Sequence, residues 1–520
     1  MTSPYLSDDC FYCILKYFQE DRLTLYNCIN VNRFWCRATI PLLYANPFNA
    51  RNNIIMTLIS CFNKKEIIQL KNQLEAIGIN NIINIDEGYK PLFEYPKYLK
   101  YYNFTKVNLR MNDWIMSHSN LSYHLSYQNV KDFGSIFHQS ILNHSINIEN
   151  FSIDFSAIFR FYFTFKIPTI SFEKLNSLTI DLRYLTHDDE KEFLSNVADH
   201  CLNLNELKIS SQMIPNISYT STDETFSMEK VYTIIQNQRN IKKLYISQYK
   251  VDDNIFLSLE SLKFSLISIE FTNTEFSNIS FDHFSNLHSL KYLNFMSCKD
   301  VEPFDRYESL KFASFELKEL RLVENYWNKN VEPIIIKHLG TSLQHLTIFD
   351  NNMTIPLIEN ISTHCLSLVT LQMNISKSFK DLDLSIFPYF KNPMMSKLII
   401  DNTGTHDYDI SKMLIKLAMN LSINVKDITF STHLDSYYSK QHFKMFLENC
   451  HGDLEKIELN DLLMGPEYFE IVLNYFETSN KNLKLLTIFR TEELDDEEVK
   501  LMNEIMSKGV NVVINYSNTF

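Results

Sequence analysis

The sequence predicts an α/β solenoid, a horseshoe of stacked repeats with parallel strands inside and helices outside, preceded by a small all-α segment. Three observations lead to this fold class. A short apolar phrase returns about every 28 residues along the C-terminal two-thirds of the chain, helical stripes separate the phrases, and the N-terminus shows helical periodicity without a strand. A chain of 520 residues is also too long for one ordinary core, so we expect several domains or one extended array.

Charge and cysteine content exclude several classes of protein. A net charge of -13 argues against a surface that binds nucleic-acid phosphates. No stretch of about 18 apolar residues predicts a membrane span, and the opening MTSPYLSDDCFY lacks the basic and apolar regions of a signal peptide. Nine thinly spread cysteines imply no disulfide framework. We therefore expect a cytoplasmic or nuclear protein that binds neither nucleic acid nor membrane.

The stretch DDCFYCILKYF, residues 8–18, predicts an amphipathic helix. Phe11, Ile14, Leu15 and Phe18 lie three, four and seven residues apart, which places them on one helical face. The two aspartates before them suit the positive end of the helix dipole. A second apolar segment follows in DRLTLYNCINVNRFWCRAT.

These residues resemble the F-box, whose pattern runs L-P-x-E-x-L-x-x-I-(F/L)-x-Y-L, then D-L and V-(C/N)-(K/R)-x-W. The positions that carry the resemblance are Leu6, Asp9, Phe11, Ile14, Leu15, Tyr17, Phe18, Asp21, Leu23, Leu25, Cys28, Val31, Asn32, Arg33 and Trp35. The resemblance implies a three-helix motif over residues 1–48 that docks on the Skp1 adaptor of a cullin-RING ubiquitin ligase. Ser7 stands where the family usually has Pro, so the start of the first helix could differ and the affinity for the adaptor could be reduced.

The resemblance also assigns a docking face. A motif of about 40 residues is marginally stable alone and tends to expose apolar surface that a partner must cover. The matching apolar residues would form the face that binds Skp1: Leu6, Phe11, Ile14, Leu15, Phe18, Leu23, Leu25, Val31 and Trp35.

Cys10 and Cys13 form a C-x-x-C pair, which also occurs in zinc and redox sites. A zinc site needs a second close pair, whereas Cys28 and Cys36 have seven residues between them and no histidine at ligand spacing. A redox pair sits at a helix start after a strand, and no strand is predicted before Cys10. We interpret these cysteines as small packing residues and expect no metal and no cofactor.

Residues 49–145 predict a helical linker and an N-terminal cap region. The stretch NIIMTLISCFNKKEIIQLKNQLEAIGI from Asn53 reads as one or two helices, and PLFEYPKYLKYYNF from Pro91 as an aromatic connector. This region resembles the linker that follows the F-box in fungal F-box proteins. The aromatic cluster FSAIFRFYFTFKIP from Phe155 is too short and too charged for a membrane span, so we expect it to cap the array.

Residues 146–520 carry about 12 to 14 repeats. After a weaker version at Ile148, the apolar phrase L-x-x-L-x-L begins at Leu175, Leu204, Ile241, Leu266, Leu290, Leu317, Leu343, Leu368, Met395, Val425, Leu454 and Leu483. Alternate side chains of a strand face opposite sides, so the later apolar positions of each phrase point into the core. Helical stripes at 410–421 and 499–506 predict a helix after each strand, and VVINY from Val512 predicts a closing strand.

The repeats resemble the leucine-rich-repeat family, which often has Asn or Cys three positions after the third strand leucine. Cys298, Asn325 and Asn351 stand at that position. Tyr249, Arg183 and Leu462 depart from it, so we expect an irregular ladder of loop hydrogen bonds.

The predicted parallel strands assign a second binding surface. Residues that point away from the core line the concave face of such an array, where partners usually bind. On three neighbouring strands they are Tyr292, Asn294 and Met296, then Glu319, Arg321 and Val323, then His345, Thr347 and Phe349. An apolar column of Met296, Val323 and Phe349 flanked by Tyr292, Arg321 and His345 is the candidate site for a client protein.

No catalytic constellation is found. The motifs H-E-x-x-H, G-x-S-x-G and G-x4-G-K-[ST] are absent from the sequence. The pairs His200–Cys201, His364–Cys365 and Cys450–His451 each lie just before a strand, at the same position in their repeats, and indicate helix ends. The acidic run EELDDEEVK from Glu492 suits the first turn of a helix.

We therefore expect a non-catalytic substrate-recognition subunit of a Skp1-cullin-F-box ubiquitin ligase, with an unknown client. The alternatives are a leucine-rich-repeat scaffold without a ubiquitin-ligase role, and an enzyme whose site is not recognised.

Overall fold

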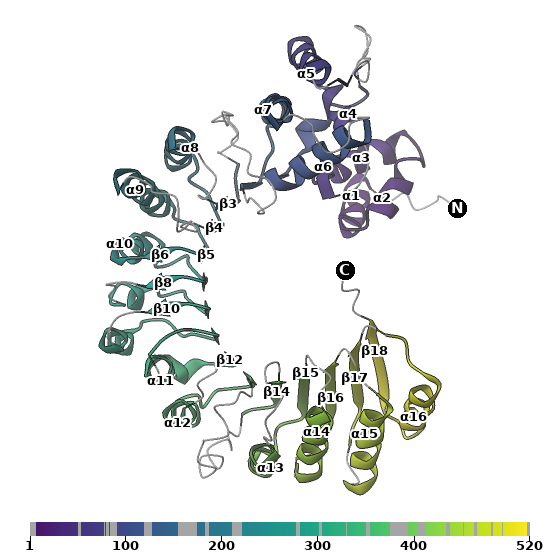
Figure 1. Ribbon diagram of the computed structural model, residues 1–520, viewed down its shortest axis with the longest axis vertical. Helices are drawn as coiled ribbons and strands as arrows, with labels where there is room; N and C mark the ends of the chain where they lie inside the picture. Colours follow the sequence, from purple (N-terminus) through teal and green to yellow (C-terminus); the bar gives the residue numbers. More distant parts are fainter. Residues whose placement is uncertain are drawn as a thin grey trace. The chain divides into compact units, whose positions relative to one another are not determined.

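The protein is described by a computed structural model that divides into two compact units, Met1–Ser247 and Gln248–Phe520 (Figure 1). The described residues are 7–49, 54–76, 78–79, 83, 91–118, 127–153, 174–181, 187–210, 221–276, 281–300, 304–328, 330–349, 354–374, 394–402, 411–432, 437–450, 452–461, 465–479, 482–490 and 492–516. Leu6, Asn351, Arg183, Leu462 and the aromatic cluster from Phe155 lie outside them.

The chain begins with three short helices, called here the helical module: α1 (Asp8–Tyr17), α2 (Arg22–Cys28) and α3 (Arg33–Leu43). Each helix is preceded by a polar residue whose side chain accepts hydrogen bonds from backbone N–H groups of the first turn: Ser7, Asp21 and Asn32. Ser7, the position that departs from the F-box pattern, is thus itself a helix cap.

The helical module has a small core of its own. Leu15, Leu25, Ala38 and Leu43 are buried together, one or two from each helix. The guanidinium of Arg22 joins the module to the following segment, because its Nη1 donates to the carbonyl oxygens of Leu43 at 3.3 Å and of Asn46 at 3.0 Å.

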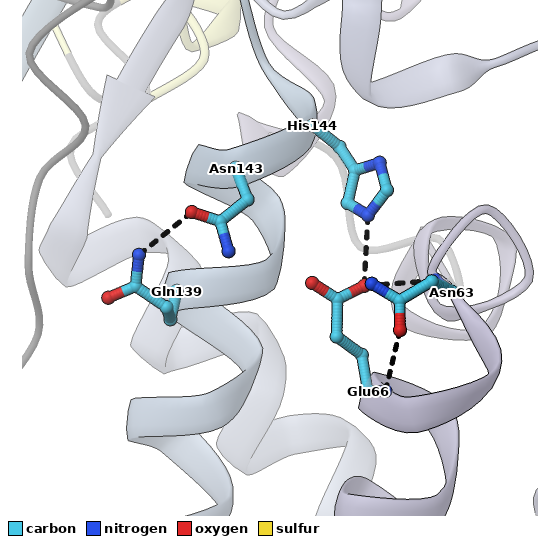
Figure 2. A network of polar contacts seen from close by, with 5 residues as sticks. All are labelled: Asn63, Glu66, Gln139, Asn143 and His144. Carbon is cyan, nitrogen blue, oxygen red and sulfur yellow. Dashed lines mark hydrogen bonds and ion pairs between the residues drawn. The ribbon is translucent and has the colours of Figure 1, made fainter.

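Four more helices follow in the first unit: α4 (Ile54–Ile59), α5 (Lys64–Ala76), α6 (Phe104–His118) and α7 (Tyr127–His144), with short 3-10 turns η1 (Pro47–Asn49) and η2 (Tyr95–Tyr98). Figure 2 shows how α5 and α7 are joined. Asn63 and Glu66 cap α5 reciprocally, and the Glu66 carboxylate also pairs with Nε2 of His144 at 2.9 Å. On another face of α7, Gln139 donates to Asn143. The helices predicted from Asn53 onward are confirmed.

A buried polar chain links the first strand to α6 and α7. The Tyr102 hydroxyl contacts Nδ1 of His138, and Nε2 of His138 contacts Oδ1 of Asn108 at 2.9 Å. Since Asn108 Oδ1 can only accept, Nε2 carries the proton and Nδ1 accepts from the tyrosine. Burial lowers the pKa of His138 to about 3, so the imidazole is neutral at physiological pH.

The repeats of the first unit supply five parallel strands in sequence order: β1 (Tyr101–Asn103), β2 (Asn150–Ile153), β3 (Ser177–Asp181), β4 (Glu206–Ser210) and β5 (Lys243–Ser247). Helices α8 (His187–His200) and α9 (Ser221–Asn237) connect the later ones. The sheet therefore starts at β1, before position 146 where the repeat phrase becomes visible in the sequence.

The second unit continues the pattern with ten parallel strands: β7 (Ser268–Thr272), β9 (Tyr292–Met296), β11 (Glu319–Val323), β12 (His345–Phe349), β13 (Thr370–Asn374), β14 (Lys397–Asn402), β15 (Asp427–Thr432), β16 (Lys456–Asp461), β17 (Leu485–Arg490) and β18 (Asn511–Tyr516). Its helices are α10 (Asp253–Ser258), α11 (Val331–Leu339), α12 (Ile355–His364), α13 (Ser411–Asn420), α14 (Tyr437–Asn449), α15 (Pro466–Ser479) and α16 (Asp496–Ser507). Figure 1 shows the helices on the convex side of this row of strands. The predicted helices at 410–421 and 499–506 and the strand at Val512 are confirmed.

Two repeats depart from the predicted alternation of strand and α-helix. Between β7 and β9, and between β9 and β11, the described residues form 3-10 turns in place of an α-helix, η6 (Phe284–Asn286) and η7 (Phe304–Phe312). The expectation of a helix after each strand is wrong there. Similar turns, η5 (Leu259–Leu262) and η8 (Gly340–Ser342), follow α10 and α11. Repeat length alone does not explain the difference, because the repeats that begin at Leu317 and Leu343 are no longer than the one at Leu290 and contain α11 and α12.

The same repeats share a left-handed turn after the strand. Gln248, Asn273, Ser297 and Glu324 have φ between 50° and 53°. Each donates its backbone N–H to the last strand carbonyl of the next repeat, as Ser297 does to Val323 at 2.7 Å. A second small parallel sheet follows these turns, formed by β6 (Lys250–Val251), β8 (Glu275–Phe276) and β10 (Lys299–Asp300).

Candidate functional site

The helical module leaves large apolar side chains uncovered. Tyr17, Leu23 and Val31 are 90%, 75% and 59% exposed, and Tyr12, Ile14 and Tyr26 are also exposed. Ile14 and Tyr17 are three residues apart on α1, as are Leu23 and Tyr26 on α2, so each pair shares a helical face. These six residues are called here the module surface. Six exposed large side chains within 20 residues make this surface the first candidate for a docking site on the helical module.

The residues assigned to Skp1 binding divide between this surface and the interior. Leu15 and Leu25 are 1% and 0% exposed and hold the three helices together. Phe18 and Trp35 are half-buried against that core, and Phe11 packs edge-on against Trp35 with ring centroids 5.3 Å apart. These five residues therefore stabilise the helical module in the uncomplexed chain.

Among the assigned residues that the structure describes, Ile14, Leu23 and Val31 remain accessible. Sequence reasoning missed Tyr12, Tyr17 and Tyr26, because a helical stripe identifies the core-facing side and says little about the opposite side. Their hydroxyl-bearing rings are suited to an interface that is partly wet.

The cysteines of the helical module differ in exposure. Cys28 packs against the core, as expected, but the packing interpretation is wrong for Cys10 and Cys13, which are exposed. They lie on α1 away from Leu15, the one residue of that helix that is buried. No cluster of three or more metal-ligating side chains occurs in the part of the chain that the structure describes.

The strand register at the predicted client site is as expected from the sequence. Tyr292 pairs with Glu319 and Glu319 with His345, while Met296 pairs with Val323 and Val323 with Phe349. The three strands thus present three rows on the concave face, first Tyr292, Glu319 and His345, then Asn294, Arg321 and Thr347, and last Met296, Val323 and Phe349.

The rows differ in exposure. Tyr292 and His345 are exposed at the strand starts, whereas Met296 and Phe349 are half-buried and Val323 is buried between them. The side chains of the apolar column therefore lie low in the concave surface and do not project from it. Asn294 and Thr347 of the middle row are buried too, a feature that the alternation of the strand did not predict.

Cys298 and Asn325, three positions after the third strand leucine of their repeats, have structural roles. Asn325 is buried, its Nδ2 donates to the Phe295 carbonyl at 3.1 Å, and its Oδ1 accepts from the Cys298 N–H at 3.0 Å. The Cys298 thiol contacts the Phe271 carbonyl, and burial raises its pKa to about 12, so it is an unreactive thiol. These side chains join neighbouring repeats.

The histidine–cysteine pairs and the acidic run singled out in the sequence also have structural roles. His200 and His364 are the last residues of α8 and α12, and Cys450 follows α14, which confirms that these pairs mark helix ends. Asp495 and Glu498 form a capping box at the start of α16, which confirms the interpretation of the acidic run.

A polar groove lies between α14 and α15, lined by Lys440, Lys444, Glu448 and Glu467 among others. Its central charges are already paired, since Lys440 contacts Glu467 and its hydrogen bond lowers the pKa of that carboxyl group. Among the described helices, none is long and apolar enough to cross a membrane.

No model of a known protein family matches the chain, and no curated protein has a matching sequence. Three similar solved structures are the Rad7–Elc1 complex of yeast, the Toll–Spatzle complex of Drosophila and the leucine-rich-repeat protein LegL7 of Legionella pneumophila. Identities are 15%, 10% and 11%, with TM-scores of 0.35, 0.35 and 0.33. The matches cover 66%, 64% and 69% of this chain, and 82%, 42% and 98% of the others. The sequential parallel strands, buried phrases and helices on one side make the repeat region a leucine-rich-repeat solenoid.

Proposed function

We propose that this chain is the substrate-recognition subunit of a Skp1-cullin-F-box ubiquitin ligase. The helical module, an F-box of the kind that precedes leucine-rich repeats in fungal proteins, binds a Skp1-type adaptor and through it the cullin. The repeat array, taken as residues 146–520 after the linker and cap of residues 49–145, binds a client protein on its concave face. The chain performs no chemistry itself, because holding a client lysine near a charged ubiquitin carrier accelerates transfer by proximity.

The observation that carries the proposal is the module surface. A three-helix module with a core of only four buried residues gains little from burial alone, yet it leaves Tyr17, Leu23 and Val31 in water. Covering a large apolar side chain contributes about 1.5 to 3 kcal/mol when burial is complete. A partner that covers this surface would therefore stabilise the module as it binds.

The cysteines support an intracellular site of action. All nine are free thiols, and Cys201, Cys298, Cys365 and Cys450 are buried where oxidants do not reach them. Free thiols are typical of the reducing cytoplasm and nucleus. We propose that the protein acts there.

Co-expression with a Skp1-type adaptor tests the proposal. The wild-type chain is expected to co-purify with the adaptor, and the double variant Leu23→Asp, Val31→Asp is expected to lose at least about tenfold in affinity, because two charges would have to be desolvated at the interface. Both residues are exposed, so the variant retains the core of the helical module.

The matched control is Ile68→Asp with Leu202→Asp, which alters two exposed apolar residues outside the helical module. It should bind the adaptor like the wild type. If the wild-type chain fails to bind, or if both double variants bind equally well, the adaptor role is wrong and the scaffold without a ubiquitin-ligase role becomes the better hypothesis.

A further inference from the structure

The middle row of the concave client site contains polar groups that have no partner within the protein. Asn294, Arg321 and Thr347 lie in register on β9, β11 and β12, and Asn294 and Thr347 are only 8% exposed. Oδ1 of Asn294 and Nε of Arg321 are both buried without a hydrogen-bond partner. Buried polar atoms are nearly always paired in folded proteins, so the unpaired Nε–H of Arg321, a donor, indicates a place where an acceptor on a ligand completes the bonding.

Arg321 carries the charge of this row. Throughout the described residues, no carboxylate lies within ion-pair distance of its guanidinium and no hydrogen bond engages it. A guanidinium offers donors in a planar fork that fits two oxygens of a carboxylate or phosphate. The amide nitrogen of Asn294 adds donors on one side, whereas the Thr347 hydroxyl on the other side donates its hydrogen to Oε1 of Gln372 at 3.4 Å.

The surrounding charges select between the two kinds of anion. Glu319 precedes Arg321 by two residues on the same face of β11, and Glu270 of β7 is in register with Asn294. Both carboxylates repel an incoming anion. A phosphate carries nearly two negative charges and is repelled more strongly than a carboxylate, which carries one. The site therefore favours a carboxylate.

The apolar column determines which kind of client side chain can bind next to the carboxylate. Met296, Val323 and Phe349 follow the middle row by two residues on each strand, a separation of about 6.6 Å. An extended peptide places side chains one or two positions apart across that distance. A client segment could then put a large apolar side chain on this column while its carboxylate reaches Arg321.

We propose that Arg321, with the amide nitrogen of Asn294, binds the side-chain carboxylate of an Asp or Glu in a client segment that has a large apolar residue one or two positions away. This inference rests on the proposed function for the location of the client site and adds the chemistry of recognition. It makes Arg321 the residue that determines specificity and the apolar column the source of additional contact area.

The test uses three sets of N-acetylated, C-amidated peptides with a central Asp, Asn or phosphoserine, each flanked by Leu or Phe at varied positions. Binding to the full chain is measured by fluorescence polarisation. The Asp set should bind at least about tenfold more tightly than the Asn set and more tightly than the phosphoserine set. Arg321→Gln should remove the preference for Asp, and Arg321→Lys should retain part of it because the charge remains while the fork is lost.

Lys397→Gln is the matched control, because Lys397 carries the same charge on the same face of β14. It should keep the preference for Asp. Equal binding of the Asp and Asn sets, no binding of any set, tighter binding of phosphoserine, or an unchanged preference in Arg321→Gln would each overturn the inference. Adaptor binding by Arg321→Gln is measured in parallel. If this variant loses the preference for Asp but still binds the adaptor, the client site is separate from the adaptor site. If the wild-type chain prefers Asp but binds no adaptor, only the proposed function is contradicted.

Discussion

Single buried polar residues determine how neighbouring parts of the chain meet. Asn325 joins two repeats through its amide, and His138 joins β1 to α6 and α7 through Tyr102 and Asn108. The role of Asn325 follows from its repeat phase and was predictable. The role of His138 was not, because its partners lie 36 and 30 residues away in sequence and no local pattern marks it.

His138 makes the stability of the first unit depend on pH. Its pKa is about 3 in the folded chain and about 6.5 when unfolded, so between these values the unfolded state binds more protons. The stabilising effect is complete above about pH 6.5 and is lost as the pH falls toward 3, by about 1.4 kcal/mol per pH unit. The midpoint of thermal unfolding should therefore fall more steeply with acidification in the wild type than in His138→Gln.

The exposed His345 supplies the control for that measurement. His345→Gln should retain the steep acid dependence of the wild type. An equal acid dependence in His138→Gln and the wild type would show that the buried imidazole is not the titrating group.

At the scale of elements, the sequence predicts strands better than the segments between them. Each phrase places two or three buried apolar residues at period two, and the twelve main phrases all become strands. The connections vary, since η6 and η7 replace α-helices in two repeats, and no regular spacing of apolar residues in these connections distinguishes the two cases in advance. The strand β1 was missed since its three residues are too few to show a period.

In the last repeat, the interactions at the start of α16 contribute much of the stability of that helix. Oε2 of Glu498 accepts from the Asp495 N–H and from Nη1 of Arg490, both at 2.9 Å, and the Arg490 and Glu498 residues are 4% and 2% exposed. Glu498→Ala would leave the arginine buried without its carboxylate. We expect a loss of about 3 to 5 kcal/mol in the free energy of unfolding, measured in urea.

Glu497→Ala removes a neighbouring acid that is exposed. It should change the free energy of unfolding by less than about 0.5 kcal/mol. Similar losses in the two variants would mean that the Arg490 pair contributes no more than the general charge of the first helical turn.

At the scale of the whole molecule, the chain combines two kinds of surface. The module surface is apolar and local to about 20 residues, whereas the concave rows of the second unit draw on strands that are 25 or more residues apart in sequence. Sequence reasoning located the concave rows because the repeat fixes their register. It could not separate the core of the helical module from its surface, because both follow the same apolar pattern until the three helices pack.

Amide hydrogen exchange of the full chain, with and without a purified Skp1-type adaptor, tests the central claim most directly. The account predicts that the adaptor slows exchange in the helical module, Asp8–Leu43, where few buried contacts now protect the backbone, and leaves strands β7 to β18 unchanged. Unchanged exchange in the helical module at a saturating adaptor concentration, or protection confined to the repeats, would contradict it.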